Sequence, residues 1–154
     1  MMTALVALIA VSAPVAAQQA PPAAQQPAAA PQPDAMKFDA KIAIVVNEVK
    51  PEKAADFEAV WTAIKAGLAA SSKPELQQQA ASLKMMKLAT EVPAGSPALY
   101  VFSLDPVVTG VSYDPVKILF ESGAFERAKA DELYAKLKDA YNRISPWPLV
   151  TFGS

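Results

Sequence analysis

The chain has 154 residues, with 14 basic and 15 acidic side chains, and it contains neither cysteine nor histidine. These two absences exclude disulfide scaffolds, thiol nucleophiles, Cys/His zinc sites, His-ligated haem and Ser-His-Asp triads. The first charged residue is Asp34, and positions 36–154 carry 14 basic and 14 acidic residues. That segment is large enough to bury one hydrophobic core, and its balanced charge disfavours nucleic acid as a partner.

The first 17 residues, MMTALVALIAVSAPVAA, predict an export signal. Their apolar run ends at Pro14 and is shorter than the roughly 20 residues that span a bilayer. The small residues at 15–17 suit a signal peptidase, so cleavage is expected before Gln18, leaving no stable membrane span. No Lys or Arg precedes the apolar run, so either the α-amino group supplies the positive charge or translation starts upstream. We expect a periplasmic or extracellular bacterial protein; a buried core helix is the alternative.

Residues 18–35 predict a disordered linker. The stretch QQAPPAAQQPAAAPQPD is composed of Ala, Gln and Pro, and almost no large apolar side chain is present to offset the entropy of ordering. Its prolines disfavour a helix at each preceding position. A ligand for a proline-binding module is the alternative, and the folded domain is expected at 36–154.

The segment that begins near Lys37 predicts a strand followed by a helix. In FDAKIAIVVNEV, β-branched residues alternate from Ile42 to Asn47 with the period of a strand. Pro51 and the acid after it suit a helix start, and Gly67 is expected to weaken the last turn before Ser71-Ser72 ends the helix. The apolar face of this helix consists of Phe57, Val60, Trp61, Ile64 and Leu68.

Six further elements complete the domain. A capping box formed by Ser72 and Glu75 opens the first of them, and Asp114 provides the N-cap of a short helix. Pro146 is expected to end a long helix, and Pro148 suits the start of a strand or an edge strand. The expected elements are a helix at Pro74–Ala81, strands in SLKMMKLATEV and ALYVFSL, a short helix from Pro115 to Phe120, a long amphipathic helix at Phe125–Ile144 and a strand at Trp147–Phe152.

The order β-α-β-β-α-β predicts an α+β fold, a ferredoxin-like sandwich with two short extra helices. Two helices would cover one face of a four-stranded antiparallel sheet, in which ALYVFSL is central because it is apolar on both faces. The strands offer apolar residues to the other face as well. A second subunit is the simplest cover for that face, so we expect a homodimer packed sheet to sheet.

The folded segment resembles the dimeric α/β-barrel superfamily, especially domains similar to antibiotic-biosynthesis monooxygenases. The resemblance spans roughly Lys37 to Gly153 and is carried by IAIVVNEVKPEKAADFEAVW, KPELQQQAASLKMMKL and ALYVFSLDP. It implies a fold shared by cofactor-free oxygenases, haem-degrading enzymes and members without known activity. The chain looks most similar to secreted bacterial proteins of unknown function. Asn47 matches an asparagine that relatives place at the end of the first strand, but the histidine of the haem-degrading relatives has no counterpart.

Four residues are candidates for ligand binding: Asn47, Tyr100, Phe102 and Tyr113. Asn47 would hydrogen-bond a substrate oxygen, or would only fix the strand-to-helix turn. Tyr100 and Phe102 share one face of a strand, where aromatics pack in a core, in a dimer interface or against a ligand. Tyr113 stands beside a helix start that attracts anions, although Asp114 competes for its N–H groups. Glu132 and Lys136 predict an i, i+4 ion pair on a solvated face.

Two functions are consistent with these residues. The first is an exported, non-catalytic dimer that binds a small apolar or aromatic ligand or serves as an interaction module, since no reactive constellation is present. The second is a cofactor-free monooxygenase acting on phenolic or quinol-type substrates, positioned by Asn47, Tyr100 and Tyr113. The sequence contains no P-loop, dinucleotide fingerprint, EF-hand or metal cluster, so no cofactor and no metal are expected.

Overall fold

The computed structural model describes residues 34–90 and 93–152, which form a four-stranded antiparallel sheet with helices on one side. The sheet has the strand order β2-β3-β1-β4. The elements are β1 (Ile42–Val49), a 3-10 turn (Pro51–Lys53), α1 (Ala54–Ala70), α2 (Pro74–Ser82), β2 (Leu83–Lys87), β3 (Ala98–Leu104), α3 (Pro115–Phe120), α4 (Arg127–Leu137) and β4 (Tyr141–Leu149). The expected α+β class is confirmed, whereas the expected signal peptide and most of the expected linker lie outside the described residues.

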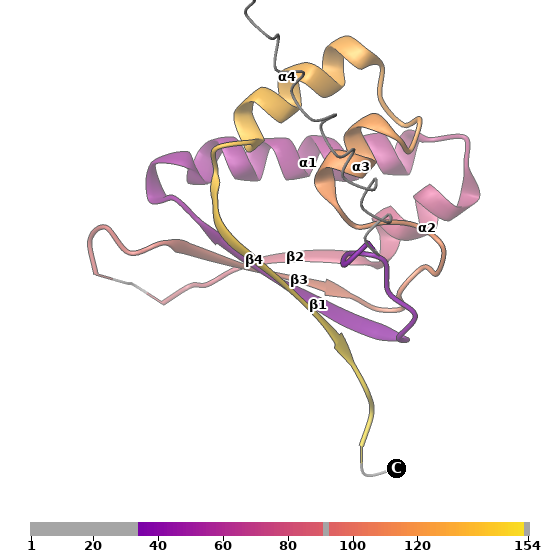
Figure 1. The fold of residues 1–154 in the computed structure, drawn as a ribbon, viewed down its shortest axis with the longest axis horizontal. Coiled ribbons are helices and arrows are strands. Elements are labelled where there is room, and N and C mark those ends of the chain that lie inside the picture. The colour runs from indigo at the N-terminus through magenta and orange to yellow at the C-terminus, as the bar shows by residue number, and fades with distance from the viewer. Residues whose placement is uncertain (1–33, 91–92, 153–154) are drawn as a thin grey trace, which may run out of the picture. The chain divides into compact units, whose positions relative to one another are not determined.

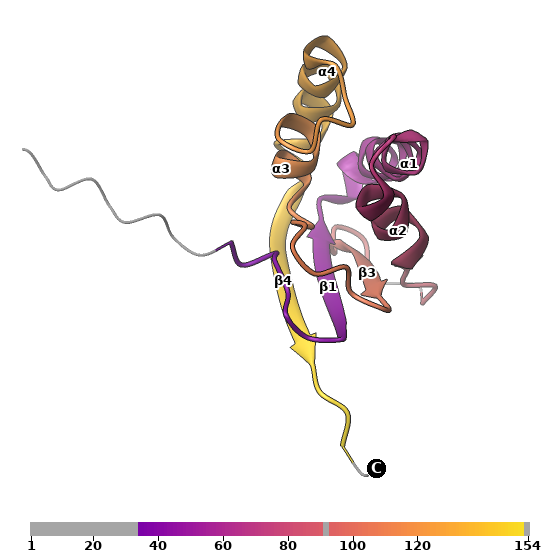
Figure 2. The ribbon, with the colours of Figure 1, turned by 90° about the vertical axis from the view of Figure 1, so that its right-hand side faces the viewer.

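The sheet presents one face to the helices and leaves the other without helices. Figure 1 shows the helices gathered above the sheet, and Figure 2, turned by 90°, shows the same separation. Burial alternates along β1, where Ala43, Val45, Asn47 and Val49 are buried toward the helices. This alternation is expected of a strand with one covered face.

Helix α1 follows its predicted pattern. Pro51 lies at the start of the 3-10 turn that leads into α1, and the five predicted apolar residues are the buried ones of the helix. The helix ends at Ala70, where Ser71 turns to an extended conformation. Gly67 does not end it: an added Cβ at this position would overlap the ring of Phe125, so the glycine makes room for that ring.

The C-terminal part of the chain differs from the prediction. The helix expected at Phe125–Ile144 is shorter and ends at Leu137, and the last strand begins at Tyr141 instead of Trp147. Tyr141 and Ile144 continue the helical period, but β4 pairs with β1 through most of its length, and these pairings outweigh the local preference. Pro146 lies within the strand and does not precede it.

The prolines of β4 are compatible with the sheet because β4 is an edge strand. Pro146 lies opposite Val45 and Pro148 lies opposite Ala43. Because Pro146 and Pro148 are two residues apart, their backbone nitrogens point to the same side of the strand. Proline has no N–H, so neither residue can donate a hydrogen bond on that side. The expectation that Pro148 belongs to an edge strand is confirmed.

Two predicted helix caps have different outcomes. The Asp114 carboxylate accepts a hydrogen bond from the Val116 N–H at 2.8 Å, so the predicted N-cap of α3 is confirmed. At α2 no side chain caps the helix, and the Ser71 hydroxyl accepts from the Lys73 N–H at 3.2 Å instead. The predicted capping box is therefore wrong, because Lys73 rather than Ser72 occupies the N-cap position.

The helix-free side of the sheet is the open face of this domain. Along β1 and β3 its residues alternate with the buried ones, and in the strand register Ile44 lies opposite Trp147 and Val46 lies opposite Val101. Trp147 is 51% exposed and Met86 is 47% exposed. The apolar residues of the open face are Ile42, Ile44, Val46, Met86, Leu99, Val101, Trp147 and Leu149, and the strand register places Glu48, Lys84 and Arg143 on the same side of the sheet. Among the described residues, none of the helices has the length and apolar character needed to cross a bilayer.

Candidate functional site

An aromatic cleft of about 280 Å³ lies between α1 and the strands β2 and β3. Helix α1 contributes Phe57 and Trp61, which lie four residues apart on its apolar face. Strand β3 contributes Tyr100 and Phe102, whose side chains point to the same face because they are two residues apart. The full lining is Phe57, Glu58, Trp61, Thr62, Met85, Met86, Lys87, Tyr100 and Phe102.

The aromatic rings of the cleft hold one another in place. The Phe57 ring centroid lies 4.6 Å from that of Tyr100, and the Trp61 centroid lies 4.7 Å from that of Phe102 in an edge-on arrangement. The Trp61 Nε1–H donates to the Tyr141 hydroxyl at 3.0 Å, and the Tyr141 ring meets Phe57 edge-on at 5.4 Å. Such edge-on pairs are favourable, and the four lining aromatic residues are only 1–4% exposed, so their rings belong to the packed core beside the cleft.

A polar group stands at the edge of the cleft. The Tyr100 hydroxyl donates to Glu58 Oε1 at 2.6 Å, and Lys87 Nζ donates to the same oxygen at 2.8 Å. The hydrogen bonds from Lys87 and then Tyr100 lower the pKa of Glu58 below its ordinary value. Burial, together with the bond to Glu58, raises the pKa of Tyr100 to about 12. At neutral pH the edge therefore carries a carboxylate, an ammonium and a protonated phenol.

Asn47 lies beside this cleft but does not line it. It is Tyr100's partner in the register between β1 and β3, and it is 1% exposed. Its side-chain Nδ2 donates to the Val45 carbonyl at 3.3 Å, which is a local contact within its own strand. The structure thus places three of the four candidates, Asn47, Tyr100 and Phe102, on one face of two neighbouring strands.

Tyr113 belongs to another part of the fold. It is 2% exposed, and its hydroxyl accepts a hydrogen bond from the Val108 N–H at 3.0 Å and lies 3.4 Å from Ser82 Oγ. Its ring packs against Phe38, with centroids 6.0 Å apart. These contacts fix the loop before α3 to the core, and Tyr113 is not part of the aromatic cleft.

The sequence prediction missed Glu58 and Lys87. Glu58 follows the buried Phe57 directly, so it borders the apolar face of α1. Lys87 is the register partner of Tyr100 across β2 and β3. A pattern of residue types does not give the register between strands, and so it gave no sign that these two charges meet the phenol.

In the described part of the chain, no cluster of three or more acidic residues is suited to hold a metal ion.

Comparisons with protein-family models, with curated proteins and with solved structures found no match to this chain. The resemblance to the dimeric α/β-barrel superfamily therefore stays a hypothesis.

Proposed function

We propose that this protein is an exported, non-catalytic dimer whose aromatic cleft binds a small, flat aromatic compound such as a phenol. One observation carries the proposal: four aromatic side chains from α1 and β3 line a cleft that ends in the Tyr100–Glu58 hydrogen bond. A volume of about 280 Å³ is at the low end for ligand pockets and suits a single ring. The edge offers hydrogen-bonding groups to a ring substituent.

The charges at the edge of the cleft favour binding over catalysis. A general base works best when its pKa lies near the working pH. The lowered pKa of Glu58 makes it a weak base, and the pKa of Tyr100, about 12, makes it a poor acid. Lys87 also balances the charge of Glu58 directly. These groups hold an uncharged ligand in place more readily than they move a proton.

The sheet supports a ferredoxin-like arrangement that pairs face to face with a second copy. The order β2-β3-β1-β4, with every neighbouring pair antiparallel, is the order expected for that fold. Exposed large apolar residues gathered on one face, such as Met86, Trp147 and Leu149 on the open face, are typical of an interaction surface. In the proposed homodimer, the open faces of two copies cover each other and leave both aromatic clefts on the helix side.

Intrinsic fluorescence tests the binding proposal directly, because Trp61 lines the cleft while the other tryptophan, Trp147, lies on the open face. In a W147F variant, Trp61 is the only reporter. We expect saturable quenching by phenol and by catechol, and binding at least tenfold weaker for cyclohexanol, which has a similar size and no ring electrons. Phe102→Leu should weaken phenol binding, and Phe120→Leu, outside the cleft, is the matched control.

Two results would contradict the binding proposal. Quenching that rises linearly without saturation indicates collisions instead of a site. Equal affinities for phenol and cyclohexanol indicate an unspecific apolar surface. Either result removes the aromatic cleft as a binding site.

A cofactor-free monooxygenase acting on phenolic or quinol-type substrates is the second candidate. It is favoured by the Glu58 carboxylate and the Tyr100 hydroxyl, which meet in a cleft of phenol size. Such an enzyme must deprotonate its substrate, and Glu58 would be the base. Oxygen uptake with a panel of hydroquinones and polyphenols tests this candidate: uptake that is lost in E58Q supports it, and no uptake above the protein-free rate excludes it.

A further inference from the structure

A lysine side chain bridges the two walls of the aromatic cleft. Lys87 is the last residue of β2, and its Nζ donates to Glu58 Oε1 of α1 at 2.8 Å. Both residues line the cleft, which lies between these two elements, so their ion pair crosses it. The same ammonium lies over the Tyr100 ring, 5.6 Å from its centroid, within the range of a cation–π contact. Lys87 therefore occupies a place that a ligand of the cleft would need.

The aromatic rings of the cleft offer little free surface in this structure. The four aromatic residues of its lining are only 1–4% exposed. A ligand that stacks on an aromatic ring covers one face of that ring. Binding of a flat compound thus requires that a side chain beside the rings first moves away.

The bridge between Lys87 and Glu58 is the contact that opens most easily. The Lys87 side chain is 54% exposed and the Glu58 side chain is 48% exposed. Ion pairs that are this accessible to water contribute little free energy and are screened by dissolved salt. Glu58 is also held by the Tyr100 hydroxyl, which donates to the same oxygen at 2.6 Å. When the bridge opens, Glu58 keeps this partner and Lys87 is the side chain that moves.

The strand that carries Lys87 is fastened independently of this bridge. At the other end of β2, Lys65 Nζ of α1 donates to the Leu83 carbonyl at 2.6 Å. The backbone of β2 pairs with β3 from Leu83 to Lys87. Opening therefore needs no movement of the strand and only a rotation of the exposed Lys87 side chain.

We propose that Lys87 gates the aromatic cleft. In the closed state its ammonium lies over the Tyr100 ring and binds Glu58. In the open state Lys87 extends into solvent, a flat aromatic ligand takes its place over the ring, and the ligand's hydroxyl donates to the Glu58 oxygen that Lys87 has left. The gate rests on the proposed function, because it controls entry to the same site.

Acrylamide quenching of Trp61 fluorescence tests the gate without any ligand, in proteins that all carry W147F. The K87M variant should have a Stern–Volmer constant about two- to fivefold higher than that of the parent, as expected for the loss of one exposed ion pair. Sodium chloride at about 0.5 M should raise the constant of the parent and leave that of K87M unchanged. In stopped-flow experiments, phenol should associate with K87M faster than with the parent by a similar factor.

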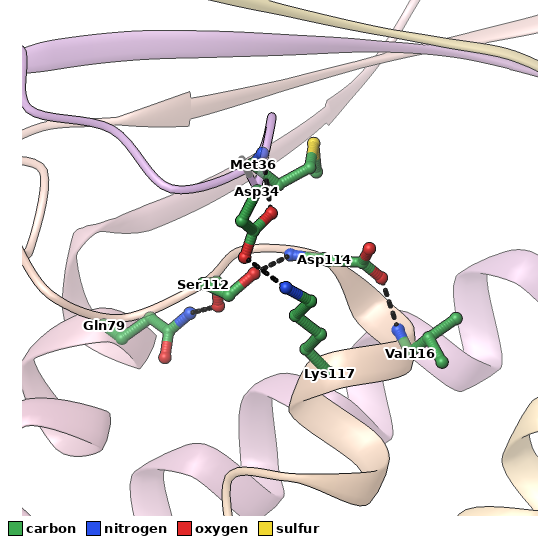
Figure 3. A network of polar contacts seen from close by, with 7 residues as sticks. All are labelled: Asp34, Met36, Gln79, Ser112, Asp114, Val116 and Lys117. Carbon is green, nitrogen blue, oxygen red and sulfur yellow. Dashed lines mark hydrogen bonds and ion pairs between the residues drawn. The ribbon is translucent and has the colours of Figure 1, made fainter. Parts of the chain in front are cut away.

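K117M is the matched control for K87M. It makes the same substitution and also breaks one ion pair, between Lys117 and Asp34 at 3.1 Å, which Figure 3 shows beside Ser112. Neither partner of that pair lines the aromatic cleft. Quenching of Trp61 in K117M should therefore equal that of the parent.

Exchange of the two charges distinguishes a gate from a loosened fold. K87E alone places two carboxylates together and should be as open as K87M. The double variant E58K/K87E forms the ion pair with its signs reversed, so its quenching constant should return to that of the parent. A double variant that stays as accessible as K87E would overturn the gate, because the loss of Lys87 would then act by loosening the fold.

The gate and the proposed ligand fail in different ways. Equal quenching of Trp61 in K87M and in the parent, at low and at high salt, removes the gate even if phenol binds to both. If quenching changes as expected and phenol binds to neither protein, the gate is supported and the phenol class is removed as the ligand.

Discussion

The Tyr100 hydroxyl and the Glu58 carboxylate lie 2.6 Å apart, although they are separated by 42 positions in the sequence and belong to a strand and a helix. The bond joins α1 to β3 at the edge of the aromatic cleft. Lys87 of β2 binds the same carboxylate oxygen. Helix α1 and two strands are thus linked through one carboxylate, whose protonation affects both the edge of the cleft and the stability of the fold.

Glu58 is expected to make stability depend on pH in the acid range. The pKa of Glu58 in the folded protein is lowered from 4.5. The free energy that the ionised carboxylate contributes to folding is therefore fully present above pH 4.5, and it is lost as pH falls through the folded pKa. In urea unfolding at pH 7, E58Q should therefore be less stable than the parent. The difference should shrink steadily below pH 4.5.

The effect of Glu58 should be modest, because its side chain is 48% exposed and solvent screens the charge. A loss of up to about 1 kcal/mol at pH 7 is expected for such a pair. Asp39→Asn provides the control, since Asp39 is exposed and forms no ion pair within the described residues. A difference between E58Q and the parent that stays constant from pH 7 to pH 3 would contradict this explanation.

The Tyr113→Phe variant tests whether Tyr113 stabilises the fold or contacts the ligand. The change removes the acceptor of the Val108 N–H, which is bound at 3.0 Å, in a buried place. The free energy of unfolding should fall by about 1–3 kcal/mol. Phenol binding, followed by Trp61 fluorescence, should stay unchanged because Tyr113 lies outside the aromatic cleft.

Tyr134→Phe is the matched control for Tyr113→Phe, since Tyr134 is 36% exposed. Its effect on stability should stay within about 0.5 kcal/mol. If Tyr113→Phe instead left stability unchanged and abolished phenol binding, Tyr113 would have to contact the ligand.

The sequence predicted the elements whose local signals and tertiary pairing agree. The strand at Ala98–Leu104 was predicted with its observed bounds, and α1 buries the five apolar residues of its predicted face. In α4 the expected ion pair between Glu132 and Lys136 is present at 3.3 Å. These features depend on periodicity and on spacing along one element, which a sequence displays directly.

The site was less predictable because it depends on contacts between elements. Tyr100 and Phe102 were identified from one strand, but the meeting of Tyr100 with Glu58 and Lys87 requires the strand register and the position of α1. The prediction of where α4 ends was wrong for a related reason. Tyr141 fits the helical period, but in the structure it is the register partner of Val49 in the sheet. In both cases a long-range contact decides where a side chain lies.

Gly67→Ala should destabilise the protein although alanine favours helices. The added Cβ would overlap the ring of Phe125, whose Cε1 would lie 2.5 Å away. Overpacking of this kind typically costs about 1–3 kcal/mol, which exceeds the helical gain of about 1 kcal/mol. Thermal and urea unfolding measure the difference.

A double-mutant cycle makes the test of Gly67 specific. In a protein that carries Phe125→Ala the ring is absent, so Gly67→Ala should then stabilise by about 0.5–1 kcal/mol. The sign of the effect depends on the ring alone. If Gly67→Ala destabilised the Phe125→Ala protein as much as the parent, the overlap would not be the cause.

The proposed dimer depends on the open face and not on the edge of the sheet. The outer edge of β4 contains Pro146 and Pro148, which offer no N–H to a further strand. Trp147 lies between them and points to the open face, 51% exposed. Addition of a strand at this edge is therefore disfavoured, while the face beside it is apolar.

Trp147→Glu should convert the proposed dimer into a monomer, because it places a carboxylate among the apolar residues of the open face. Analytical ultracentrifugation of the parent should give a dimer. The dissociation constant of the variant's dimer should be at least tenfold higher than that of the parent. Tyr134→Glu is the matched control, since it introduces the same charge at an exposed aromatic residue of α4, on the helix side. A monomeric parent, or equal dissociation of both variants, would contradict pairing through the open face; phenol binding by a monomeric parent would still leave the aromatic cleft as a site within one subunit.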